Sequence, residues 1–190
     1  MLQATPNLGA LEISTFLSLI LYGIFTTQVY SYFATSRGDS LWLKLMIGVL
    51  FFLETCHSFT ASQTIYSDTV THWMTEQPNS YPLSTTVLLE TLVTLTVHSF
   101  FSHRIHKLSR SVFLGMICFT LAILRFLGGF VLVVEIYKDI PNVPNGVGYA
   151  KKWAWLITAA LTVGATLDIT IALSMCFYLR KLASPGNFRS

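Results

Sequence analysis

Five long apolar segments restrict the fold of this chain more than any other feature. They cover residues 11–33, 41–62, 83–101, 112–136 and 153–179, and a membrane-spanning helix needs about 20 mostly apolar residues. The apolar runs are continuous, whereas the strands of a membrane barrel alternate apolar and polar residues. A helix also satisfies its own backbone hydrogen bonds, which hydrocarbon requires. We therefore predict an all-α, polytopic transmembrane helical bundle with about five spans.

The composition excludes several other classes of protein. Only 11% of the 190 residues are charged and 53% are hydrophobic, whereas an ordinary soluble domain has about 25% charged residues. These values exclude a disordered chain, a disulfide scaffold and a typical cytosolic enzyme. We expect residues 1–182 to form a single transmembrane domain and residues 183–190 a short cytoplasmic tail. The predicted localisation is an integral, multi-pass membrane protein, and the sequence leaves the organelle open.

The distribution of Lys and Arg predicts the orientation, because these residues collect on the cytoplasmic side of a membrane. With the N-terminus outside, eight of the twelve Lys and Arg residues lie at the inner face and three at the outer face. The basic third loop contributes Arg104, Lys107 and Arg110, whereas the second loop, residues 63–82, holds Asp68 and no Lys or Arg. We therefore predict that the N-terminus is outside and the C-terminus inside.

Two further patterns agree with this topology. Tyr81 and Tyr137 are among the aromatic residues that fall at the proposed outer face, and such rings prefer the headgroup level. No basic residue precedes the first apolar segment, which is also longer than the apolar core of a usual signal peptide. We interpret this segment as a retained helix.

Six ionisable side chains inside the predicted spans are the candidate site residues. They are Glu54, His57, Glu90, His98, Arg125 and Asp168. A charge at the bilayer centre costs about 2.5 kcal/mol or more, so such a residue normally faces other helices or a hydrated cavity. We therefore expect these side chains to line a polar pocket within the bundle.

The rise of a helix, about 1.5 Å per residue, places four of these residues in the outer half of the bilayer. Glu54, Glu90 and Arg125 fall at one level, and His57 lies one turn further out on the same face as Glu54. We predict that Arg125 pairs with Glu54 or Glu90 and that the cluster faces the bundle interior.

A second level lies in the inner half of the bilayer. His98 and Asp168 are each 15 residues from the outer start of their segments, or roughly 22 Å down. Thr86, Glu90, Thr94 and His98 recur at every fourth residue, and side chains at this spacing are neighbours on a helix surface. We expect this polar ridge to join the two levels.

Three interpretations of the polar core stay open. The first is a set of buried ion pairs and hydrogen bonds that fixes the register of the helices. The second is a pathway for a ligand, an ion or a proton, because stacked carboxylates and histidines relay protons. The third is an intramembrane active site in which a carboxylic acid protonates an apolar substrate.

Motifs for metal and cofactor chemistry are weak in this sequence. Glu54-x-x-His57 has the spacing of a di-iron carboxylate helix, but such a site needs a second Glu-x-x-His, which the chain lacks. We predict no metal, no cofactor and no nucleic-acid partner, and we expect the intramembrane Ser and Thr residues to bond to their own backbone. The expected partners are the lipid bilayer and a small apolar or protonatable ligand; homo- and hetero-oligomers are both open.

Three stretches of the chain carry a family resemblance. They are LYGIFTTQVYSYF followed by Asp39, Lys44 and Glu54-x-x-His57; HSFFSHRIHKLS; and DITIALSMCFYLRK. The chain resembles a large family of fungal, mushroom-type seven-helix integral membrane proteins that carry a domain of unknown function. The resemblance implies an outside N-terminus and a helical bundle, and it implies no known activity. Family members continue through two more helices after the stretch that matches residues 168–181, so we expect a short form with the first five helices.

Our leading hypothesis is a non-enzymatic membrane protein that transports or senses a small molecule or proton through the polar pocket. The alternative is a membrane-embedded enzyme of fungal secondary metabolism, such as a terpene cyclase. An enclosed cavity with one protonated carboxylate would then have aromatic walls from Phe100, Phe126, Phe130 and Trp155. A purely structural role for the ion pairs is the third possibility, so whether the protein is an enzyme stays open.

Overall fold

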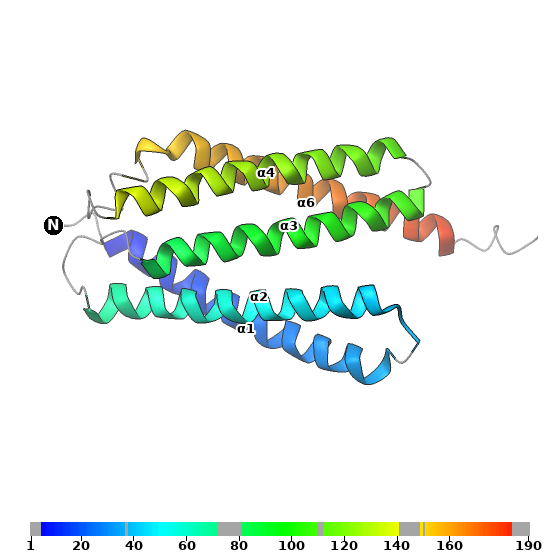
Figure 1. Ribbon diagram of the computed structural model, residues 1–190, viewed down its shortest axis with the longest axis horizontal. Helices are drawn as coiled ribbons and strands as arrows, with labels where there is room; N and C mark the ends of the chain where they lie inside the picture. The colour runs from blue at the N-terminus through cyan, green and yellow to red at the C-terminus, as the bar shows by residue number, and fades with distance from the viewer. Residues whose placement is uncertain are drawn as a thin grey trace, which may run out of the picture. The chain divides into compact units, whose positions relative to one another are not determined.

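All elements in the described part of the chain are helices, as the sequence predicts (Figure 1). The computed structural model of the protein describes residues 5–36, 38–71, 81–109, 112–140, 149 and 151–183. The elements are α1 (Thr5–Thr35), α2 (Leu41–Tyr66), the short π-helix η1 (Ser67–Thr71), α3 (Tyr81–Ser109), α4 (Val112–Asp139) and α6 (Ala154–Ala183). The tail predicted at 183–190 lies outside the described residues, apart from its first position.

Five of the described helices are long and apolar enough to cross a membrane. This confirms the all-α class and the five predicted spans. The helices are longer than the apolar segments that predict them: α1 has 31 residues, or about 46 Å, against about 30 Å of hydrocarbon. The backbone hydrogen bonds of a helix continue past the point where its side chains become polar, so hydropathy marks the membrane-spanning part and not the helix ends.

The third helix corrects one boundary. The predicted span ends at residue 101, but α3 continues to Ser109 and carries Arg104 and Lys107, which the sequence pattern places in a loop. His106 and Lys107 occupy its last turn, where positive charge is favourable beside the unpaired carbonyls of a helix C-terminus.

A second correction concerns Asp68, which the sequence places in an outer loop. The residue lies in η1, which continues directly from α2, and it is only 8% exposed. The chain after Tyr66 therefore stays helical for another turn.

Contacts divide the chain into two compact units, which are described separately. Unit 1 comprises residues 1–93 and 133–152, and unit 2 comprises residues 94–132 and 153–190. Helices α3 and α4 each contribute to both units. The single domain predicted from the sequence stays a prediction.

In unit 1, α1 packs against α2. The Tyr22 hydroxyl lies 2.8 Å from the Thr55 hydroxyl, and the Tyr22 ring stacks on Phe51 at 6.3 Å between centroids. The start of α3 also meets the end of α4, because the rings of Tyr81 and Tyr137 lie 6.4 Å apart. The two helix ends therefore share one side of this unit, which agrees with placing both tyrosines at the same membrane face.

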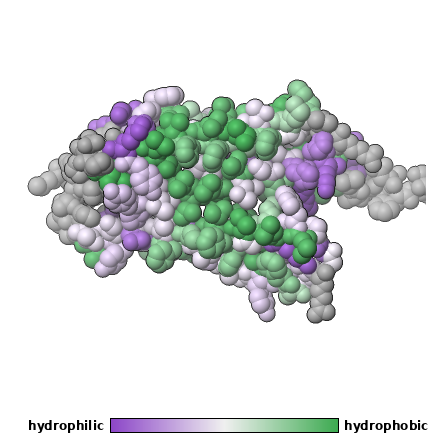
Figure 2. Space-filling model, viewed as in Figure 1, coloured by the Kyte–Doolittle hydropathy of each residue, from purple (hydrophilic) through white to green (hydrophobic). Residues whose placement is uncertain are grey.

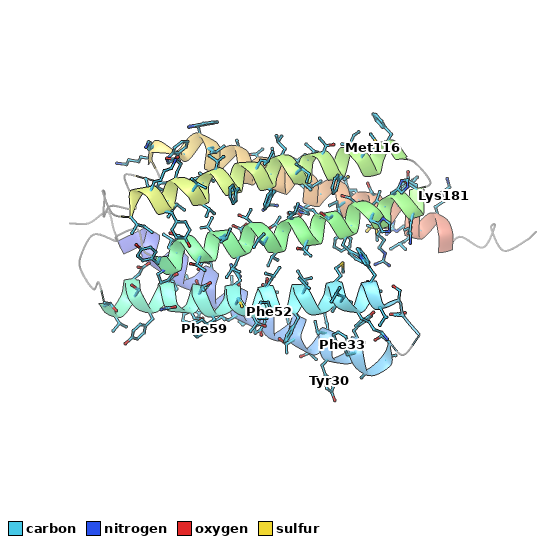
Figure 3. The ribbon with its side chains drawn as sticks, in the orientation of Figure 1. Tyr30, Phe33, Phe52, Phe59, Met116 and Lys181 are labelled. Atoms are coloured by element: carbon cyan, nitrogen blue, oxygen red, sulfur yellow. The ribbon has the colours of Figure 1, made fainter. Side chains whose placement is uncertain are left out.

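In unit 2, α3, α4 and α6 share a small apolar core. Its buried members are Ile105 of α3, Cys118 and Ala122 of α4, and Leu167 and Ile171 of α6. Gly115 lets α4 approach α3 closely, since a Cβ at this position would lie 2.9 Å from the Cβ of His106. Met116 near the start of α4 and Lys181 near the end of α6 lie toward the same end of this unit (Figure 3).

The surface of the helices is largely apolar, and apolar side chains dominate the face seen in Figure 2. Phe52 and Phe59 of α2 are 65% and 70% exposed, and Tyr30 of α1 is 77% exposed (Figure 3). Soluble proteins rarely leave so much large apolar surface uncovered. These side chains are suited to contact with lipid, the bilayer partner that the sequence predicts.

Threonines on the spans bond to their own helices, as expected, whereas the buried hydroxyls of Ser58 and Ser102 have no hydrogen-bond partner in the described residues. Thr162, Thr166 and Thr170 of α6 each donate to the carbonyl four residues earlier, at 2.7–2.8 Å. This local bonding satisfies the hydroxyl groups without a partner helix.

Candidate functional site

The structure brings together two of the six candidate residues, His98 of α3 and Asp168 of α6. Nε2 of His98 lies 2.8 Å from Oδ1 of Asp168, although the residues are 70 positions apart. The face of α6 next to Asp168 is buried through Gly164, Leu167 and Ile171. Because this face packs against the other helices of unit 2, Asp168 comes within reach of His98. The lower level predicted from helix rise therefore contains a direct side-chain contact.

The two partners differ sharply in exposure. The His98 side chain is 4% exposed, whereas the Asp168 side chain is 64% exposed. An ionised carboxylate only accepts hydrogen bonds, so beside ionised Asp168 the proton of neutral His98 is on Nε2. The carboxylate thus links a buried imidazole to the surroundings of the bundle.

Two buried polar atoms beside this pair have no hydrogen-bond partner in the described protein residues. They are Nδ1 of His98 and Oγ of Ser102. Ser102 is only 3% exposed and follows His98 by one helical turn. Buried polar atoms are normally hydrogen-bonded, because desolvation without a partner costs about 1–3 kcal/mol. Sequence reasoning missed Ser102, although it continues the four-residue spacing of the predicted polar ridge.

Arg125 of α4 lies against α6 at Gly164. A Cβ built on Gly164 would lie 2.5 Å from Cζ and 2.6 Å from Nη1 of Arg125. Glycine is therefore required for the guanidinium to occupy this position. Gly164 precedes Asp168 by four residues. The guanidinium of Arg125 therefore lies against α6 about one helical turn from Asp168.

A groove between α4 and α6 extends from Arg125. It has a volume of about 460 Å³ and is otherwise lined by apolar side chains, including Trp153 and Trp155. Phe126 and Phe130, whose rings lie 6.1 Å apart, do not line it, and neither does Phe100. Of the four aromatic residues predicted to wall an enzyme cavity, Trp155 alone is among the residues that line this groove.

The upper-level residues of unit 1 are arranged differently. Nδ1 of His57 lies 3.9 Å from Oε1 of Glu54 on α2, too far for a hydrogen bond. Both side chains are half-buried, at 17% and 24% exposed. This pair is therefore a weak electrostatic contact within one helix.

Glu90 of α3 is exposed, whereas His98 on the same predicted ridge is buried. Successive positions four residues apart rotate by about 40° around a helix, so the two side chains are separated by about 80°. Glu54 and Glu90 belong to unit 1 and Arg125 to unit 2, so the predicted pairing of Arg125 with either carboxylate stays a prediction. The single pocket lined by all six residues also stays a prediction.

Within the described ranges, no group of three or more His, Cys, Asp and Glu residues is arranged to hold a metal ion. The cysteines are free thiols: Cys118 is buried, Cys56 half-buried and Cys176 exposed.

Comparison with known proteins adds no relative. No protein-family model matches the chain, and no curated protein or solved structure matches it. The five long apolar helices nevertheless define a class: the protein is a multi-pass integral membrane protein in contact with the lipid bilayer.

Proposed function

We propose that this membrane protein transports or senses protons through His98 and Asp168. The observation that carries the proposal is the 2.8 Å contact between a buried imidazole and an exposed carboxylate within membrane-spanning helices. Histidine exchanges protons near neutral pH. Ionisable residues in membrane helices are costly and commonly mark proton relays.

The pair has the chemistry to move a proton inward from the helix surface. The exposed carboxylate of Asp168 binds a proton, and when neutral His98 carries its own proton on Nδ1, the carboxylic acid passes the new proton along the hydrogen bond to the unprotonated Nε2. The imidazole then carries a proton on each nitrogen and releases the one on Nδ1, and return of the remaining proton from Nε2 to Nδ1 restores the accepting tautomer. Each step transfers one proton and leaves the covalent skeleton unchanged.

Among the described residues of unit 2, the titratable groups that bear on His98 come from three helices. Asp168 approaches from α6. On α4, the guanidinium of Arg125 lies one turn of α6 away from Asp168, and Cys118 is fully buried in the adjacent core. Ser102 on α3 adds a neutral hydroxyl. Protonation of His98 therefore changes the charge directly beside the Asp168 carboxylate.

Proton flux into liposomes tests the proposal. The purified protein is reconstituted with a pH-sensitive dye inside, and a potassium gradient with valinomycin drives proton entry. We expect His98→Gln and Asp168→Asn each to reduce the flux at least tenfold, because each removes one proton-binding group while largely keeping side-chain shape. In a sensor without flux, the same variants should abolish a pH-dependent change in tryptophan fluorescence.

Matched variants control for nonspecific damage. His103→Gln changes an exposed histidine on α3, and Glu135→Gln changes a carboxylate that lies 2.9 Å from Lys138 near the end of α4. Both should retain the wild-type response. A wild-type protein with neither flux nor a pH response would contradict the proposal. If the wild type shows neither response and both site variants also lose folded protein, the purely structural role is favoured.

The enzymatic alternative receives less support from the geometry. A cyclase of the expected type needs an acid inside an apolar cavity. The groove between α4 and α6 is apolar, but its described lining holds Arg125 and no carboxylate. We therefore favour transport or sensing of protons, and we rank transport or sensing of a small molecule second.

We also propose the orientation and the family that the sequence indicates. Basic residues in the last turns of α3 and α6 support an inner location for both helix ends, and the three resembling stretches support the fungal seven-helix family.

Protease protection of terminal tags in sealed, right-side-out vesicles tests the orientation. We expect an N-terminal tag to be cleaved from outside and a C-terminal tag to be protected, because the basic helix ends favour the cytoplasmic side. Permeabilised vesicles, in which both tags are cleaved, provide the control. Cleavage of the C-terminal tag alone in sealed vesicles would mean that the predicted orientation is inverted.

A further inference from the structure

We propose that a water molecule binds between Nδ1 of His98 and the Ser102 hydroxyl, and that it accepts the proton released by His98. This inference rests on the proposed proton function and names the next acceptor in the pathway. It begins from the two buried polar atoms that lack a hydrogen-bond partner in the described residues.

The location favours a ligand that is small and polar. His98 and Ser102 are 3% exposed each, and they are one turn apart on α3, where side chains are neighbours. Ordered buried waters typically make two to four hydrogen bonds to otherwise unsatisfied groups. The imidazole nitrogen and the hydroxyl supply two such bonds.

The chemistry of the imidazole favours water over a ligand with a fixed donor or acceptor. With Asp168 ionised, Nε2 carries the proton and Nδ1 needs a donor. With Asp168 protonated, Nε2 accepts its proton and Nδ1–H needs an acceptor. Water and a serine hydroxyl both donate and accept, so this arrangement satisfies Nδ1 in either state.

Proton release can be balanced atom by atom. The protonated imidazole loses the hydrogen on Nδ1, and the water oxygen gains it. The resulting hydronium gives one of its other hydrogens to the Ser102 hydroxyl oxygen while the original Ser102 hydrogen passes to a further water molecule, so the first water and the serine both return to their neutral forms. The next residue at this spacing is His106, which is exposed near the end of α3. His98 and Ser102 therefore form a buried segment between two exposed titratable residues, Asp168 and His106.

Ser102→Ala tests the inference, because it removes one of the two groups that would hold the water. We expect proton flux to fall about tenfold, and we expect Ser102→Thr, which retains a hydroxyl, to restore much of it. Ser99→Ala is the matched control on the same helix, since Ser99 is half-buried and adjacent to His98 in sequence. The control should keep the wild-type flux.

A second measurement does not depend on flux. Water-edited solid-state NMR of ¹⁵N-histidine-labelled protein reports polarisation transfer from water to the His98 ring, assigned with His98→Gln. We expect rapid transfer in the wild type and slow transfer in Ser102→Ala. Slow transfer in the wild type overturns the inference.

The outcomes separate the two proposals. If His98→Gln and Asp168→Asn abolish flux but Ser102→Ala does not, the proton function stands and the water site is wrong. If the wild type shows no flux and no pH response, the proton function fails, and the NMR measurement still decides whether water binds at Ser102.

Discussion

Gly164→Ala is expected to lower the free energy of unfolding by about 2–3 kcal/mol relative to Gly128→Ala. The new Cβ would occupy space within 2.5 Å of the Arg125 guanidinium. A flexible side chain can swing away at small steric cost, so the clash itself is the minor term. The larger cost arises because a cation in a membrane-spanning helix loses its present surroundings.

Gly128→Ala is the matched control for this effect. Both glycines lie inside helices, so both substitutions gain up to about 1 kcal/mol of helix propensity, but a Cβ on Gly128 has nothing within 4 Å. Unfolding in mixed micelles at increasing SDS, followed by tryptophan fluorescence, measures the difference.

A double-mutant cycle with Arg125→Ala identifies the cause. If displacement of the guanidinium is responsible, Gly164→Ala should cost little in a protein that already carries Arg125→Ala, which gives a coupling energy of about 2 kcal/mol. An equal loss of stability in both backgrounds would mean that the backbone of α6 is disturbed instead.

Leu167→Ala is expected to cost about 2 kcal/mol of stability. Leu167 is fully buried in the core of unit 2, against Cys118 and Ala122 of α4 and Ile105 of α3. In water-soluble cores this substitution costs about 2–5 kcal/mol, part of which is transfer of the side chain from water. Detergent and lipid are as apolar as leucine, so mainly the lost contacts and the cavity contribute here.

Leu173→Ala on the same helix is the matched control, because Leu173 is 66% exposed. Its loss of stability should stay within about 0.5 kcal/mol. The same SDS titration measures both variants. Equal effects at the two positions would show that α6 does not pack through Leu167 in the folded protein.

At the proposed proton site a buried histidine, His98, contacts an exposed aspartate, Asp168. Helix geometry explains this difference in exposure. His98 faces the packed interior of unit 2, whereas Asp168, its hydrogen-bond partner, lies at the edge of the contact between α3 and α6. The position next to a buried residue on a helix is turned by about 100°, so Asp168 follows the fully buried Leu167 and still reaches the surface. A carboxylate at such an edge can serve a buried histidine without being enclosed itself.

The amino-acid sequence alone determined the helical class and the five spans, and it placed His98 and Asp168 at one depth. In hydrocarbon, a continuous apolar segment satisfies its backbone hydrogen bonds by forming an α-helix. The rise per residue is nearly constant, which is why the sequence places these two residues at one depth. The tertiary structure alone decided which sides of the helices face inward. Most of these helices are apolar all round, and the polar ridge of α3 includes both exposed Glu90 and buried His98, so polarity does not indicate the buried faces. The burial of Ser102, the exposure of Asp168 and the fit of Arg125 over Gly164 depend on how each helix is rotated against its neighbours, and only packing sets that rotation.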